Sequence, residues 1–111
     1  MMQTIYCLEL AGGRFYVGQT PVGRFPTRYE EHFRGGSKWT LRFKPVRVMW
    51  TRDVPFSDAD RIEDAEVLRI MLQHGANSCR GGTFNIARDV SVCPMWAKRD
   101  YRDNWGRIAS R

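Results

Sequence analysis

Two tyrosines, an arginine and a histidine near the start of the chain have the types and the spacing that phosphodiester chemistry needs. Tyr6 and Tyr16 lie in two short apolar segments separated by a glycine pair, and Arg28 and His32 follow four residues apart. A glycine pair favours a hairpin turn, which brings the two tyrosines to one face of paired strands. Residues at i and i+4 share one face of a helix. A phenol, an imidazole and a planar cation on one small surface suit the hydrolysis of a phosphodiester.

The elements that must position these residues follow from hydrophobic periodicity and turn residues. The periodicity predicts strands over residues 3–10, 14–19 and 45–51, a further short strand over 83–87, and helices from Arg28 to about Phe33 and from Ser57 or Asp58 to about His74. Thr27 is the expected N-cap of the first helix, and residues 37–44 are expected to form a loop. Val46, Val48 and Trp50 are expected on one side of the third strand.

This order predicts a small α+β domain over residues 1–87, with a mostly antiparallel three-stranded sheet and helices packed on it. Residues 88–111 show no clear period, and we expect a basic C-terminal tail, either a packed extension or flexible.

Composition favours an acidic polymer as partner. The 111 residues carry 18 Lys and Arg against 12 Asp and Glu, a net charge of +6, which suits DNA. The 13% of aromatic residues argues against disorder. Three cysteines without a CxxC pair give no disulfide framework, and no apolar run has the length of a signal peptide or membrane span. We therefore expect a protein of the cytoplasm, or of the nucleoid or nucleus, that is not secreted and has no membrane partner.

The motifs and their order resemble the GIY-YIG nuclease family. Thr4-Ile5-Tyr6 stands for the first motif, with Thr at the Gly position, and Tyr16-Val17-Gly18 stands for the second, with Val for Ile. The resemblance covers about residues 3–87 and continues through Gly18-x-Thr20, Arg28-x-x-x-His32, Gly36-x-x-x-Thr40, Pro45 and the segment 74–84. The loop between Tyr16 and Arg28 is about two residues longer than in many relatives, so Arg24 competes with Arg28 for the arginine role.

The resemblance implies a metal-dependent endonuclease with a tyrosine-centred site and one divalent metal, Mg²⁺ or Mn²⁺. Tyr6 is the candidate general base, with neighbouring cations lowering its pKa from roughly 10. Tyr16 would orient the water or phosphate, or pack as a cross-strand partner. Arg28 would clamp the phosphate, and His32 would position it or share proton handling with Tyr6.

Two glutamates of the second long helix compete for the metal. On a helical wheel Glu66 lies on a polar arc with Arg69 and Gln73, whereas Glu63 lies between Val67 and Ile70 on an apolar arc. A carboxylate on an apolar face is costly unless it is paired or binds a metal. Glu63 is therefore favoured over Glu66 as the ligand, and one carboxylate with several waters suits Mg²⁺.

Basic and aromatic residues outside this cluster are the expected nucleic-acid contacts. Backbone phosphates would bind the cations and an unpaired base would stack on an aromatic ring. The candidates are Arg24, Lys38, Trp39, Arg42, Lys44, Asn77 and Arg80. Trp39 competes with a role in covering the sheet, and Asn77 and Arg80 compete with simple turn formation.

The sequence thus predicts an endonuclease that hydrolyses DNA phosphodiester bonds. A non-catalytic nucleic-acid-binding module of the same fold is the alternative, and a protein–protein adaptor with an incidental basic surface is a third reading. The tail is too short to form a recognition domain, so target choice would depend on DNA shape, on the tail or on a partner protein.

Overall fold

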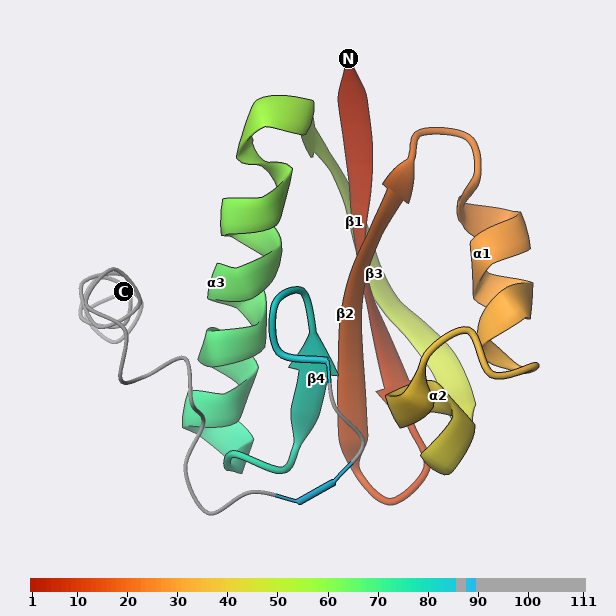
Figure 1. Cartoon of the computed structure of the whole chain (residues 1–111), viewed down its shortest axis with the longest axis vertical. Helices are drawn as coiled ribbons and strands as arrows, with labels where there is room; N and C mark the ends of the chain where they lie inside the picture. The colour runs from red at the N-terminus through yellow and green to blue at the C-terminus, as the bar shows by residue number, and fades with distance from the viewer. Residues whose placement is uncertain (86–87, 90–111) are drawn as a thin grey trace.

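The computed structural model describes residues 1–85 and 88–89, which form four strands and three helices (Figure 1). In chain order these are β1 (Met2–Leu10), β2 (Arg14–Pro21), α1 (Phe25–His32), α2 (Lys38–Arg42), β3 (Pro45–Pro55), α3 (Phe56–His74) and β4 (Cys79–Gly81). The α+β class is confirmed. The expectation for the tail lies outside the described residues, apart from Arg88 and Asp89.

The sheet has four strands in the order β3-β1-β2-β4, with β1 at its centre. Strand β1 pairs antiparallel with β2 and with β3, whereas the short β4 pairs parallel with β2. The sheet predicted as mostly antiparallel and three-stranded has a fourth strand, and this short edge strand is the one that pairs parallel. Strand β4 lies at residues 79–81; of the strand predicted over 83–87, Phe84 forms only an isolated bridge with Gly81, and residues 86–87 lie outside the described residues.

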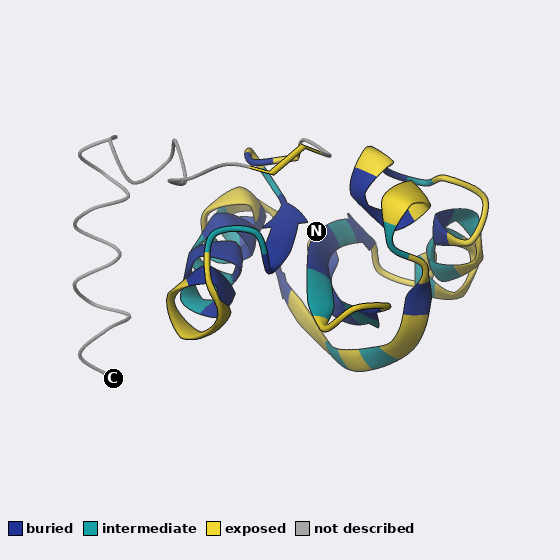
Figure 2. Ribbon diagram, turned by 90° about the horizontal axis from the view of Figure 1, so that it is seen from below, coloured by how far each residue is buried: buried dark blue, intermediate teal, exposed yellow. Residues whose placement is uncertain are grey.

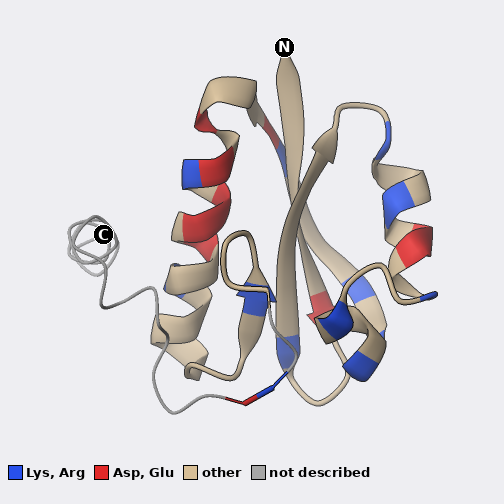
Figure 3. Ribbon diagram, in the orientation of Figure 1, with Lys and Arg blue, Asp and Glu red and all other residues tan. Residues whose placement is uncertain are grey.

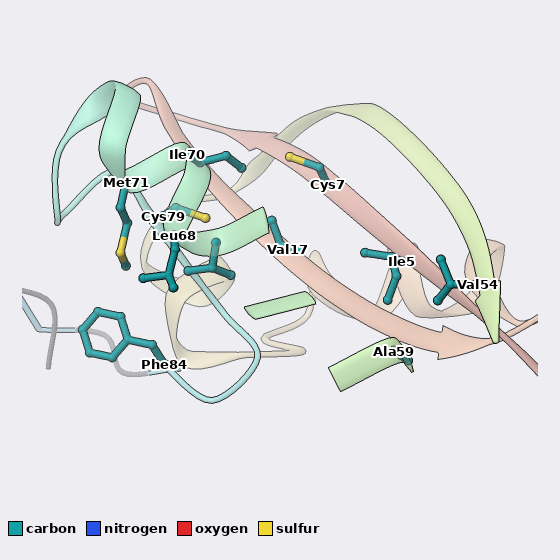
Figure 4. Packing of buried hydrophobic residues seen from close by; sticks show 11 residues of the cluster. Ile5, Cys7, Val17, Val54, Ala59, Leu68, Ile70, Met71, Cys79 and Phe84 are labelled. Carbon is teal, nitrogen blue, oxygen red and sulfur yellow. The ribbon is translucent and has the colours of Figure 1, made fainter. Parts of the chain in front are cut away.

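Strict alternation along β1 and β2 separates two apolar clusters, one on each face of the sheet. Helix α3 lies over one face, and α1 and α2 lie over the other (Figures 1 and 2). The α3 face holds Ile5, Cys7, Val17, Val54, Ala59, Val67, Leu68, Ile70, Met71, Cys79 and Phe84 (Figure 4). The opposite face holds Tyr6, Leu8, Leu10, Tyr16 and Trp39. Tyr6 and Tyr16 share one face, as predicted, and this face is the one away from α3.

A β-bulge on β3 changes which face its side chains reach. Cys7 pairs with Trp50 but Leu8 pairs with Val48, so Met49 is the extra residue. Trp50 consequently packs against the α3 face and Val48 against the opposite face. The expectation that these two residues share one side is wrong, because the bulge shifts the alternation by one.

The helix starts differ from the predicted ones. Helix α1 begins at Phe25, since Pro26 fits the first helical turn, and Thr27 is inside the helix rather than its N-cap. Helix α3 begins at Phe56 without a side-chain cap. Within the predicted loop 37–44, Ser37 and Thr40 form a reciprocal capping box that starts α2.

Arg80 of β4 joins the sheet edge to α2 from inside the protein. It is fully buried, and its guanidinium lies 4.5 Å from the ring centroid of Trp39 and 4.6 Å from that of Phe84. It donates hydrogen bonds to the carbonyls of Ala76, Cys79 and Arg88 and to Oδ1 of Asn77, over 2.7 to 3.1 Å. This network satisfies several backbone acceptors of the segment after α3.

No helix in the described part of the chain is long and apolar enough to cross a membrane.

We expect Arg80→Met to destabilise the fold strongly, because the buried carbonyls of Ala76 and Cys79 would lose their donor. The free energy of unfolding should fall by about 3 kcal/mol or more, measured by urea denaturation. Arg61→Met is the matched control, because Arg61 is exposed and its only ion pair within residues 1–85 and 88–89 is at the surface with Asp58. An equal loss in both variants would contradict the structural role of Arg80.

Candidate active site

Tyr6 and Tyr16 lie together on the sheet because of the glycine between them. The two rings are 6.2 Å apart between centroids, and Gly18 pairs directly with Tyr6 across β1 and β2. A Cβ atom on Gly18 would lie 2.8 Å from Cε2 of Tyr16 and closer still to the hydroxyl of Tyr6. Only glycine at this position lets the Tyr6 ring lie over β2.

His32 of α1 is fully buried beside this pair and links it to α2. The Tyr6 hydroxyl lies 2.7 Å from Nε2 of His32, and Nδ1 lies 2.9 Å from Oγ1 of Thr40. With the ring proton assigned to Nδ1, Tyr6 donates to Nε2 and Nδ1 donates to Thr40, which can donate to the Ser37 carbonyl at 3.3 Å. The residues form a continuous hydrogen-bonded chain from the phenol to the capping box of α2.

The buried imidazole is neutral near pH 7. Burial, together with the positive charge of Arg28, lowers the pKa of His32 to about 4. A neutral imidazole has one free acceptor nitrogen. Nε2 is therefore able to accept the Tyr6 proton.

Arg28 lies next to the tyrosines and is held by α1 and the turn after it. Its Nη2 donates to the Gly36 carbonyl at 3.0 Å, and its Nη1 lies 3.4 Å from Oε1 of Glu31. A Cβ atom on Gly36 would lie 3.1 Å from Nη1 of Arg28, so this glycine also makes room for the site. Charge and hydrogen bonding from Arg28 act on both phenols.

Burial nevertheless dominates the acidity of both tyrosines. Desolvation raises the pKa of Tyr6 well above its ordinary value and raises that of Tyr16, while Arg28 only partly offsets the effect. Arg28 lowers the pKa of Tyr6, as expected of a neighbouring cation, but burial raises it by more, so the net shift is upward. In the free protein Tyr6 is a neutral phenol.

Glu63 reaches the same region from α3, around the outer edge of β2. The residue is 7% exposed, and its carboxylate accepts a hydrogen bond from Nε2 of Gln19 at 3.2 Å; the same amide donates to Asp60 at 2.6 Å. Burial, opposed by the Gln19 hydrogen bond and assisted by the charges of Asp64 and Asp60, raises the pKa of Glu63 to about 7. The Glu63 charge in turn raises the pKa of both site tyrosines.

Glu66 lies elsewhere. Its carboxylate is 2.8 Å from Nε of Arg69 and 4.0 Å from Arg52, and it acts on the pKa of Cys7, on the α3 side of the sheet. Of the two candidate glutamates, the structure brings Glu63 to the tyrosines and Glu66 to arginines.

The donor chemistry of Glu63 fits a hard divalent cation. A buried carboxylate with a raised pKa lacks compensating positive charge, and Mg²⁺ binds one or two carboxylates while keeping waters and phosphate oxygens as its other ligands. No group of three or more His, Cys, Asp or Glu side chains suited to a metal occurs among residues 1–85 and 88–89. Any metal bound at Glu63 would therefore depend on water and substrate for most of its coordination.

The expected nucleic-acid contacts divide into exposed and buried residues. Arg24, Lys38, Arg42 and Lys44 are exposed, and basic residues gather around α2 and the adjacent strand ends (Figure 3). Trp39 is fully buried, and its indole Nε1 donates to the Phe15 carbonyl.

Trp39 and Arg80 cannot contact a nucleic acid from these positions, and both predictions are corrected. Trp39 covers the sheet, and Arg80 supports the segment after α3. Asn77 is half-buried and accepts from Arg80, so it helps to hold that segment.

Sequence reasoning missed the residues that support the site. The motif pattern includes Thr40 without predicting a role for it, and it predicts none for Gln19 or Asp60. The Ser37-x-x-Thr40 spacing, which is typical of a capping box, is the local signal for Thr40. Nothing local indicated that Gln19 would meet α3, because that contact spans 44 residues of sequence.

Comparison of the chain with models of protein families, with curated proteins and with solved structures gives no significant match. The resemblance to the GIY-YIG nucleases therefore depends on the residues and their spacing alone.

We expect Glu63→Gln to change how stability depends on pH. Because the folded-state pKa of Glu63 lies above its unfolded value, the wild type loses stability as pH rises from about 4.5 to about 7. The variant lacks this loss. The difference in free energy of unfolding between the variant and the wild type should therefore rise by up to about 3 kcal/mol from about pH 4 to about pH 8. Urea denaturation across this range measures the difference. The exposed Glu30→Gln is the control, and a flat difference for Glu63→Gln would contradict the raised pKa.

Proposed function

We propose that this chain is a metal-dependent endonuclease that hydrolyses DNA phosphodiester bonds, as its resemblance to the GIY-YIG family implies. The observation that carries the proposal is that four side chains gather on one face of the sheet, namely Tyr6, Tyr16, Arg28 and His32. Glu63 comes from α3, on the other face. Such a group of ionisable residues, with several pKa values shifted by burial, is typical of functional sites.

Each residue has a role that its surroundings support. The planar guanidinium of Arg28 would bind the scissile phosphate by paired hydrogen bonds, exchanging its contact with Glu31. Tyr16 would orient the phosphate or the attacking water. Glu63 would hold Mg²⁺ or Mn²⁺, which when bound supplies Lewis-acid stabilisation of the charge on the phosphodiester.

Proton transfer would run through Tyr6 to His32. As the water oxygen forms its bond to phosphorus, the water proton passes to the Tyr6 oxygen and the Tyr6 proton passes to Nε2 of His32. The imidazolium would keep its Nδ1 donation to Thr40, and the departing oxygen would take a proton from solvent. This relay needs no phenolate in the free protein, which accords with the raised pKa of Tyr6.

The first experiment is cleavage of labelled plasmid, branched and single-stranded DNA with Mg²⁺, Mn²⁺ or EDTA. We expect metal-dependent cleavage that falls by about 100-fold or more in Tyr6→Phe and Glu63→Gln. Glu66→Gln is the matched control and should retain the rate, because its carboxylate is paired with arginines. Intact DNA under every condition, with tight and salt-sensitive binding, would favour the non-catalytic nucleic-acid-binding module instead.

A second measurement tests the metal ligand without catalysis. Mn²⁺ or Mg²⁺ should raise the melting temperature of the wild type and of Glu66→Gln by several degrees, with no rise in Glu63→Gln. The rise should grow as pH increases through about 7, because the Glu63 carboxyl must lose its proton before it binds a cation. An equal rise in all three proteins would place the metal elsewhere.

A further inference from the structure

Glu31 of α1 lies between two arginines at the edge of the candidate site. Nη2 of Arg24 donates to both carboxylate oxygens of Glu31, at 3.0 and 3.1 Å, and Nη1 of Arg28 lies 3.4 Å from Oε1. Arg28 also acts on the pKa of both buried tyrosines. One carboxylate is therefore held by two guanidinium groups next to the place where chemistry is proposed.

A phosphate can bind two guanidinium groups in the same way as a carboxylate does. Guanidinium groups bind carboxylates and phosphates through the same parallel N–H donors. The side chains are open to solvent, with Arg24 46%, Arg28 24% and Glu31 40% exposed. Exposed ion pairs contribute little stability, so an incoming anion can replace Glu31 without disturbing the fold.

We propose that the Glu31 carboxylate occupies the place that a substrate phosphate takes between Arg24 and Arg28. The inference rests on the proposed function, since it takes a phosphodiester of nucleic acid as the ligand. Arg24 and Arg28 are then not alternatives for one role but two halves of one phosphate-binding pair. Glu31 keeps this pair in place in the free protein and weakens the binding of any anion that does not displace it.

The chain offers a matched control one residue away. Glu30 is exposed, and no ion pair of its side chain occurs within the described residues. Glu30→Gln and Glu31→Gln change the net charge equally, so a difference between them reports the local contact. Both residues lie on α1, where one acidic segment follows one basic segment (Figure 3).

The experiment is fluorescence anisotropy with a short labelled DNA duplex and its single strand, in EDTA so that metal-dependent cleavage is prevented, over a series of salt concentrations. Glu31→Gln should tighten binding about fivefold, whereas Glu30→Gln should change it less than about twofold. Arg24→Gln should weaken binding and reduce the slope of log affinity against log salt by about one. Melting curves verify that each variant is folded.

The outcomes separate this proposal from the one on which it rests. Equal effects of Glu30→Gln and Glu31→Gln, or an unchanged salt slope in Arg24→Gln, would overturn the exchange of anions. If the wild type still binds the DNA in that case, the proposal of a nucleic-acid ligand stands. A wild type that binds neither probe would overturn both proposals. Tighter binding in Glu31→Gln alone, with the reduced slope in Arg24→Gln, would support the exchange.

Discussion

The close approach of Tyr6 to the backbone of β2 at Gly18 is the contact on which the candidate site depends. Any side chain at Gly18 would overlap the phenol, and the ring could no longer lie where its hydroxyl meets His32. His32 in turn fixes Thr40 and the start of α2. One missing Cβ thus determines the positions of a strand tyrosine, a helix histidine and the next helix together.

The outer edge of β2 is where Glu63, which comes from the α3 face, meets a side chain of the strand. Strand β4 pairs with β2 only over Phe15–Val17. Beyond Val17 no described strand lies along that edge, and there Gln19 meets Glu63 and Asp60 of α3. Because β4 ends its pairing at Val17, Gln19 is left to meet α3 at this edge.

Local patterns predicted the parts of the protein that local physics determines. The faces of β1, the shared face of Arg28 and His32 and the burial of Glu63 all follow from periods of two and 3.6 residues. The fourth strand, the bulge at Met49 and the interior positions of Trp39 and Arg80 depend on contacts between distant segments. Arginine is usually a surface residue, and the hydrogen bonds of Arg80, together with the rings of Trp39 and Phe84, make its buried guanidinium tolerable.

Without substrate, the groups of the candidate site are mostly neutral or already paired. This affects how the proposed chemistry would begin. Tyr6 and His32 are both uncharged, Arg28 is occupied by Glu31 and Gly36, and Glu63 has a pKa of about 7. The Glu63 charge is among the causes that hold the phenol pKa values high. A divalent cation at Glu63 would keep that carboxylate ionised and reverse the sign of the field that it exerts on the phenols. In the proposed mechanism Glu63, with its charge offset in this way, would no longer oppose the loss of the Tyr6 proton to His32.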